Sequence, residues 1–257
     1  MLRFTDNERI FSEATFRGVV QRMLDDLAAS RVEHVDLRIG PSVGRWRWMR
    51  SVRDGLDVFK DELSGRKDLS VAFLAGINFT KSPDQLETIF ATLRNDGELV
   101  DRLAGLDLNF LPEDLPKFEH HLSELLDLQA NGLKINVHLG ELFHNDVSRY
   151  VVSRLTPNRV GHGVLLLDDQ WLVDFVKAND ICLDMCPTSN TKLGVADWDL
   201  ESPASRALQL GIPVSINTDD PLLFGTDIET ELRKAQLKDE QLEAVIADSR
   251  KYRYGAS

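Results

Sequence analysis

The sequence has few cysteines and no excess of positive charge. Its two cysteines, Cys182 and Cys186, lie four positions apart in one strand-like segment, too distant along the strand to be bridged easily. We therefore expect two free thiols and a reducing compartment, which favours the cytoplasm. The chain has 42 acidic and 30 basic residues and a net charge of -12, which argues against nucleic acid or an anionic membrane as its main partner.

Long apolar runs and a phosphate-binding loop are also lacking. No stretch reaches the roughly 18 apolar residues that a membrane-spanning helix needs. The opening residues, MLRFTDNERIF, lack the basic and apolar regions of a signal peptide. No glycine-rich loop follows the first predicted strand, which disfavours an open doubly wound sheet. The hydrophobic content of 42% over 257 residues predicts one globular domain spanning residues 1–257.

Apolar, β-rich runs alternate with helical patterns along the chain. Strands are expected at 32–39, 69–77, 106–110, 133–137, 159–160, 181–185 and 213–216. Helices are expected at 9–29, 52–63, 83–103, 114–131, 145–154, 169–179, 203–210 and 227–250. Repeated strand–helix units predict an α/β fold with a parallel sheet closed into a TIM-type (β/α)8 barrel. Such a barrel needs eight strands, so the predicted barrel lacks one, most simply its first.

Four short polar motifs follow the last four predicted strands. They are HLGE at 138–141, GHG at 161–163, CPTSN at 186–190 and TDDP at 218–221. Parallel barrels carry their active sites at the carboxyl ends of the strands, so these motifs are expected to meet at one rim. Two histidines, a glutamate and a pair of aspartates are the side chains of a metal-assisted hydrolase.

Each of these residues also has an ordinary structural interpretation. His138 can bind Zn²⁺ and Glu141 can transfer protons, but the same segment could simply begin a helix beside a partly buried histidine. His162, between two glycines, could orient a water or be structural. Asp219 and Asp220 could bind a metal and a substrate, or form a turn that opens a helix. The ordered set of four motifs favours the functional interpretation.

Two other features have weaker functional interpretations. Cys186 lies between Met185 and Pro187 with no basic neighbour in sequence, so we interpret it as a packing residue rather than a nucleophile. The run RWRWMR at 45–50 alternates basic and aromatic residues, a pattern that can stack on nucleic acid. In an acidic protein, after a strand, a loop at the barrel rim is the preferred interpretation.

The segments VHLGE, RVGHGV, CPTSN and SINTDDPLLF together resemble the adenosine/AMP deaminase family of the amidohydrolase superfamily. HVDLR at 34–38 and GLDL at 105–108 are similar to the second and fourth strands of that family, so the resemblance covers roughly residues 9–254. It implies a (β/α)8 barrel that holds one Zn²⁺. It also implies hydrolytic replacement of a purine amino group by oxygen, with release of ammonia.

The resemblance also implies a role for each motif residue. His138 and Asp219 would be zinc ligands, and Asp219 would also contact the attacking hydroxide. His162 would orient and deprotonate that water. Glu141 would protonate the ring nitrogen beside the carbon under attack.

Two further residues would contact the substrate, a purine nucleoside or related small molecule. Gly140 would lie against it, and Asp220 would hydrogen-bond the nitrogen of its imidazole ring.

The sequence departs from the family pattern in three places. No His-x-His stands upstream of the four motifs, although the family takes two zinc ligands from such a motif on its first strand. Phe110 stands where the family has a glycine beside the purine, and a ring there would crowd adenosine. Leu139 replaces a smaller residue.

The missing His-x-His leaves an alternative function open. Either a first strand is absent from this sequence and the enzyme is otherwise ordinary, or the chain is an inactive barrel that binds a purine or a protein partner. Unpaired strand edges beside the gap would need a cover, either the N-terminal segment or another subunit in a homo-oligomer.

Overall fold

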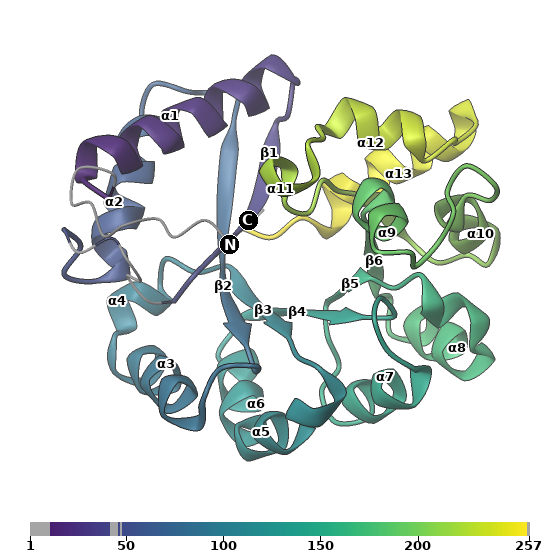
Figure 1. Ribbon diagram of the computed structural model, residues 1–257, viewed down its shortest axis with the longest axis horizontal. Helices are drawn as coiled ribbons and strands as arrows, with labels where there is room; N and C mark the ends of the chain where they lie inside the picture. The colour runs from purple at the N-terminus through teal and green to yellow at the C-terminus, as the bar shows by residue number, and fades with distance from the viewer. Residues whose placement is uncertain (1–10, 42–45, 47, 256–257) are drawn as a thin grey trace.

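The strands form a single parallel sheet in the computed structural model, which describes residues 11–41, 46 and 48–255. Within these residues the sheet has seven strands, in the spatial order in which they occur in the sequence. They are β1 (His34–Ile39), β2 (Ser70–Asn78), β3 (Gly105–Asn109), β4 (Lys134–Leu139), β5 (Arg159–His162), β6 (Cys182–Met185) and β7 (Val214–Ile216). Figure 1 shows the strands at the centre with the helices around them. The prediction of a (β/α) barrel with seven of its eight strands is confirmed.

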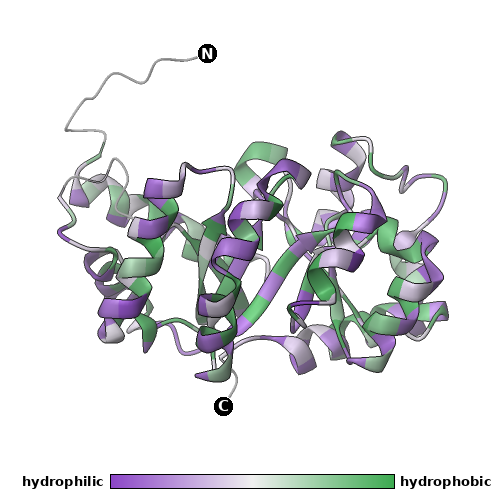
Figure 2. Ribbon diagram, turned by 90° about the horizontal axis from the view of Figure 1, so that it is seen from below, coloured by the Kyte–Doolittle hydropathy of each residue, from purple (hydrophilic) through white to green (hydrophobic). Residues whose placement is uncertain are grey.

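The helices lie on the outside of the sheet. The α-helices are α1 (Glu13–Ala29), α2 (Val52–Leu63), α3 (Pro83–Asn95), α4 (Gly97–Val100), α5 (Leu115–His120), α6 (Leu122–Ala130), α7 (Asn145–Val152), α8 (Gln170–Ala178), α9 (Pro187–Lys192), α10 (Pro203–Gln209), α11 (Pro221–Phe224), α12 (Ile228–Lys234) and α13 (Asp239–Tyr252). Two 3₁₀ helices are η1 (Pro112–Asp114) and η2 (Leu165–Asp168). Figure 2 shows that the helices carry both hydrophobic and hydrophilic residues, as a layer between sheet and solvent requires. No helix of the described residues is long and apolar enough to cross a membrane.

Helix α3 shows how the local sequence sets these elements. Ser82 and Gln85 form a reciprocal capping box, and Pro83 occupies the first turn, where its missing N–H costs no hydrogen bond. The buried residues Leu86, Ile89, Phe90 and Leu93 follow at helical spacing. Each such side chain stabilises the fold by about 1.5–3 kcal/mol on burial, so this stripe holds α3 on the sheet.

Three of the expected helices are interrupted, and those predictions were wrong in extent. The helix expected at 83–103 ends at Asn95, because the side chain of Asp96 accepts a hydrogen bond from the backbone of Leu99 and starts α4. The helix expected at 114–131 is divided at His121. The helix expected at 227–250 is divided near Gln236, whose φ of 51° is left-handed. In each case two shorter helices take the place of one expected helix.

A buried ionic group, the Arg159 cluster, joins strands across the barrel interior. The Arg159 guanidinium pairs with Asp36 of β1 and donates through Nε to Oδ2 of Asp184 of β6 at 2.8 Å. The hydroxyl of Ser215 donates to the other Asp184 oxygen at 2.7 Å. Because β1 and β5 are not neighbours in the sheet, the pair between Asp36 and Arg159 must cross the interior.

The C-terminal segment completes the Arg159 cluster. The buried ring of Tyr254 lies 4.4 Å from the Arg159 guanidinium, and its backbone N–H donates to Asp36 at 3.2 Å. Tyr254 also packs on Ala72 and Leu74 of β2. Figure 1 shows this yellow segment running from α13 to the centre beside β1. The C-terminal residues therefore fill part of the interior near the β1 edge, whereas residues 1–10, predicted as a possible cover, lie outside the described residues.

The described part of the RWRWMR run is packed against the protein. The rings of Trp46 and Trp48 lie 5.0 and 5.7 Å from the ring of Phe16 in α1. Residues 42–45 and 47 lie outside the described residues. Aromatic rings held in this way serve the packing of α1 rather than the stacking of exposed bases.

Candidate active site

The predicted motif residues come together at the carboxyl ends of β4 to β7. His138 pairs in register with Gly161, and Leu139 with His162, so the first two motifs are side by side. Donor atoms of His138, Glu141 and His162 lie within 4.8 Å of one another, as do those of His162, Cys186 and Asp219. We call these five residues the strand-end site. His162 belongs to both groups and therefore lies between the other residues.

His138 is fixed by a carboxylate that the residue-by-residue interpretation missed. Its Nε2 lies 2.9 Å from Oδ1 of Asp107 on β3, and Asp107 also faces Arg38 of β1 at 3.7 Å. Burial opposes protonation of His138, but the Asp107 carboxylate outweighs it, and the pKa of His138 is raised. Gly161 makes room for this ring, because a Cβ there would lie 3.2 Å from it. Asp107 lies in the GLDL segment, which indicated the family resemblance but no role for this residue.

His162 is buried and neutral. Burial, together with the charge of His138, lowers its pKa to about 3. The side-chain amide of Asn190 donates from Nδ2 to Nδ1 of His162 at 3.1 Å, which places the ring proton on Nε2. That Nε2 lies 3.4 Å from Oε2 of Glu141. The ring is therefore a neutral hydrogen-bond donor toward the centre of the site.

Glu141 has the pKa expected of a proton donor at neutral pH. Burial raises the pKa of its carboxyl group to about 7, and the nearby Asp219 adds to the rise, while His138 opposes it. Gly140 creates the bend that turns Glu141 out of the strand. Its φ is +64°, and a Cβ there would lie 2.1 Å from a methyl group of Leu166. Both the turn and the space therefore require glycine.

Asp219 and Asp220 point to different partners. Oδ2 of Asp219 accepts a hydrogen bond from the hydroxyl of Ser189 at 2.7 Å, while burial raises the pKa of Asp219. Asp220 is exposed and precedes Pro221 as the N-terminal flanking residue of α11. The chain therefore presents Asp219 to the strand-end site and Asp220 to solvent. The turn that opens a helix, the alternative interpretation of this motif, is also present before α11.

Two residues of the strand-end site have a left-handed backbone. His162 and Asp219 adopt φ values of 65° and 54°, which are unfavourable for side chains with a Cβ. Such conformations cost about 1–3 kcal/mol each and persist only where the surroundings impose them. Because Arg31, Asp180 and Gln236 share this conformation outside the site, it shows that packing constrains the two residues and does not by itself mark a functional site.

The short helix α9 supports two residues of the site. Ser189 binds Asp219 and Asn190 binds His162, so adjacent residues of the CPTSN motif hold side chains from two different strands. The start of α9 is held by the fully buried Glu231, which accepts a hydrogen bond from the backbone of Thr188 at 2.8 Å. The motif was recognised from the sequence, but these supporting contacts were not.

Phe110, where the sequence predicts crowding of adenosine, packs into an aromatic cluster. Its ring packs with Phe79, Phe118 and Phe143 at centroid distances of 6.3, 5.8 and 5.9 Å. Phe110 is 4% exposed, so its ring is buried within this aromatic cluster. Because Phe143 follows Glu141 by two residues, the cluster also braces the loop that carries Glu141.

The donor chemistry of the strand-end site fits a zinc ion. Imidazole nitrogen, carboxylate oxygen and thiol sulfur are all zinc ligands, and catalytic zinc sites use three protein ligands. The contact between Asp107 and His138 is the kind of carboxylate–histidine contact that fixes metal-binding imidazoles. Cys186 is unbridged and buried, as predicted, and burial raises its thiol pKa. His138, Asp219 and their neighbours are therefore candidate metal ligands.

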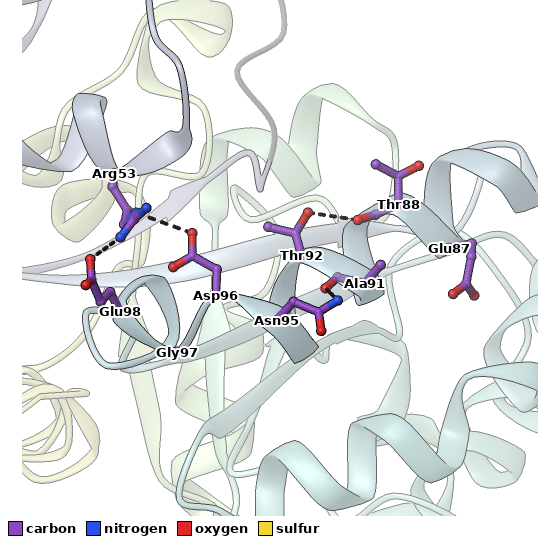
Figure 3. Close-up of a pocket in the computed structure, with 9 residues that line it drawn as sticks. All are labelled: Arg53, Glu87, Thr88, Ala91, Thr92, Asn95, Asp96, Gly97 and Glu98. Atoms are coloured by element: carbon purple, nitrogen blue, oxygen red, sulfur yellow. Dashed lines mark hydrogen bonds and ion pairs between the residues drawn. The ribbon is translucent and has the colours of Figure 1, made fainter.

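A shallow pocket elsewhere on the surface has no comparable chemistry. Figure 3 shows it between α2, α3 and α4, where Arg53 faces Asp96 and Glu98. Arg53 already pairs with both carboxylates, and Glu87 is turned away at the far end. The pocket is distant in sequence and in the fold from the strand ends, so we do not assign the active site to it.

Comparisons with known proteins identify the family and the fold. The adenosine deaminase family model matches residues 7–248. An adenosine deaminase of Serratia proteamaculans is 31% identical over 222 residues, which are 84% of this chain but only 64% of the Serratia protein. Two solved structures share the fold at 20% identity and cover 93% of this chain. They are a zinc-bound amidohydrolase of Burkholderia ambifaria (TM-score 0.76, 68% of that chain) and an adenine deaminase of Arthrobacter aurescens (TM-score 0.72, 80% of that chain).

Proposed function

The chain belongs to the adenosine deaminase family, and we propose on that basis that it catalyses hydrolytic deamination of adenosine or a related aminopurine. The reaction adds water at the amino-bearing ring carbon and releases ammonia. The family match over most of the chain and the adenine deaminase fold of the Arthrobacter protein support this class of substrate. The two unbridged cysteines favour the cytoplasm as its location.

We propose that a zinc ion binds at the strand-end site, with His138 and Asp219 as two of its ligands. They belong to different groups of close donor atoms, and the sequence has no His-x-His to supply the further ligands that a catalytic zinc site uses. A bound zinc ion would make water nucleophilic at neutral pH, a role it has in many hydrolases. Asp107 would hold the His138 ring in place, and Ser189 would hold one oxygen of Asp219. The zinc-bound Burkholderia neighbour supports a metal in this fold.

The proton donor of the proposed reaction is Glu141. With a pKa of about 7, the carboxyl group is partly protonated at neutral pH and can deliver a proton to the ring nitrogen beside the reacting carbon. Protonation there avoids a build-up of negative charge on the ring. This perturbed carboxyl group, buried beside a neutral histidine, is the observation that carries the proposal.

The remaining site residues would position the reactants. His162 is neutral and carries its proton on Nε2, so it would orient the attacking water by donating a hydrogen bond. Gly140 would let the substrate approach the backbone, and Asp220 would contact the far side of the purine.

The direct test is release of ammonia from a panel of purines that includes adenosine, adenine and AMP. We expect turnover of at least one compound and a loss of about 10²–10⁴-fold in kcat for Glu141→Gln. Glu229→Gln, an exposed change in α12, is the matched control and should leave turnover unchanged. Binding of a purine without ammonia release from any compound would contradict the proposal and favour a binding barrel.

A further inference from the structure

A second group of metal-ligand side chains lies away from the strand-end site. Donor atoms of Glu87, His120 and His121 lie within 4.8 Å of one another. Glu87 belongs to α3, His120 ends α5, and His121 joins α5 to α6. The group therefore connects two helical segments on the outside of the barrel, and the proposed deaminase function does not use it.

His121 is held in the orientation that a ligand needs. The ring is 3% exposed, stacks on Phe90 with centroids 4.0 Å apart, and meets Oε2 of Glu124 through Nδ1 at 2.7 Å. Nε2 is the ring nitrogen that does not contact Glu124. A carboxylate on one nitrogen of a metal-binding imidazole fixes the ring and increases its basicity.

The carboxylate of Glu87 is supported in a similar way. Its Oε1 accepts a hydrogen bond from Arg94 at 2.5 Å, and the same guanidinium pairs with Glu124. Arg94 thus links the ligand Glu87 to the carboxylate that orients His121. The other oxygen of Glu87 is not bound to Arg94.

We propose that Glu87, His120 and His121 bind a divalent transition-metal ion, with zinc as the expected occupant. Two imidazoles and one carboxylate form a three-residue ligand set that leaves a position for water. Imidazole ligands favour zinc, copper or nickel over magnesium and calcium, which prefer oxygen. The ion would tie α3 to the turn between α5 and α6.

The test is a metal titration of the purified full chain with Zn²⁺ and with Co²⁺ as a coloured probe. Glu87 and His120 are exposed, so Glu87→Gln combined with His120→Asn should fold normally. We expect the wild-type chain to bind one more equivalent of metal than this variant. The Co²⁺ spectrum of the variant should lack the contribution of one site. His144→Asn, at another exposed histidine, is the matched control and should bind as the wild type does.

Thermal unfolding gives a second readout that does not depend on activity. Because metal bound only to the folded state stabilises it by mass action, added Zn²⁺ should raise the Tm of the wild type more than that of the variant. The titration is repeated in a His138→Asn, Asp219→Asn background, which removes the proposed active-site ligands. Loss of one equivalent of metal in that background would test the zinc ion of the proposed function. Loss of one equivalent with Glu87→Gln and His120→Asn would test the site proposed here. Equal binding by the wild type and the Glu87, His120 variant would overturn the proposal.

Discussion

The barrel interior contains two groups of buried ionisable side chains, and they are paired in different ways. In the Arg159 cluster, Asp36 and Asp184 each bond directly to one guanidinium. In the strand-end site, Glu141 lies 3.4 Å from the neutral ring of His162 and near His138, and it makes no ion pair with an arginine or lysine among the described residues. The first group is compensated by a permanent cation, and the second keeps a carboxyl group whose burial raises its pKa to about 7.

This contrast separates a structural role from a chemical one. Asp36 and Asp184 join two strands through the Arg159 guanidinium, because removing either partner would leave an unpaired charge in the interior. Burial nevertheless raises the pKa of Asp184. A buried carboxyl group without a cation can exchange its proton near neutral pH. The strained backbone of His162 and Asp219 belongs to the second group only, as far as the described residues extend. The four experiments below are designed to break or sharpen this distinction.

The largest effect is expected for Glu141→Gln in the strand-end site. The change removes the proposed proton donor, so kcat should fall by about 10²–10⁴-fold, measured as ammonia release. The same change also removes the cost of burying a charge at pH 8. The free energy of unfolding should therefore rise, by about 1–3 kcal/mol, in urea titrations. Lower activity combined with lower stability would show that Glu141 holds the fold rather than performing the chemistry.

The next effect is expected in the Arg159 cluster. Arg159→Met leaves two buried carboxylates without their cation and should lower the free energy of unfolding by about 3–5 kcal/mol. Arg206→Met is the matched control, since its ion pair with Asp168 is exposed and should contribute at most about 1 kcal/mol. Equal losses for the two variants, measured by urea unfolding, would remove the distinction between the clusters.

Much of the fold could be predicted because it follows from local patterns. Alternating apolar and amphipathic runs located all seven strands, and the capping box at Ser82 marks a helix start. Helix breaks were not predictable, because Gln236 is a common helix residue whose left-handed conformation is imposed by packing. The Arg159 cluster was also missed, since no sequence spacing relates Asp36 to a guanidinium 123 positions away.

The candidate site was only partly predictable for the same reason. Strand ends and their motifs indicated that His138, His162 and Asp219 would meet, because parallel strands end at one rim. Supporting residues such as Asp107 and Asn190 act through contacts between strands that register alone does not specify. The direction of the Phe110 ring was not predictable, because a sequence position does not reveal into which cluster a ring turns.

A smaller effect is expected at Asn190, which positions His162. Asn190→Ala removes the donor to Nδ1 and frees the ring to change tautomer, so kcat should fall by about 10–100-fold with stability nearly unchanged. The carboxylate introduced by Asn190→Asp would accept a hydrogen bond from Nδ1–H of His162 and so favour the other tautomer, which should be at least as damaging. If Asn190→Asp retained full activity in the ammonia assay, the proton on Nε2 of His162 would not be required.

The smallest effect concerns pH. In the folded protein Glu141 has a pKa of about 7, raised from its ordinary 4.5, so the protonated form prevails below pH 7 and is lost above it. The kcat should therefore fall about tenfold per pH unit above pH 7, and this decrease should be absent from the residual activity of Glu141→Gln.

The free energy of unfolding should also decrease as the pH rises. The folded state holds this proton more tightly between pH 4.5 and 7, so the stabilisation it gives declines as the pH rises through that interval. Asp36, whose pKa is lowered despite its burial because it pairs with His34 and Arg159, contributes in the opposite direction, and its stabilisation disappears only in acid. A wild-type rate that stays constant to pH 9 would show that the two groups of buried carboxyls do not differ in the way their pairing implies.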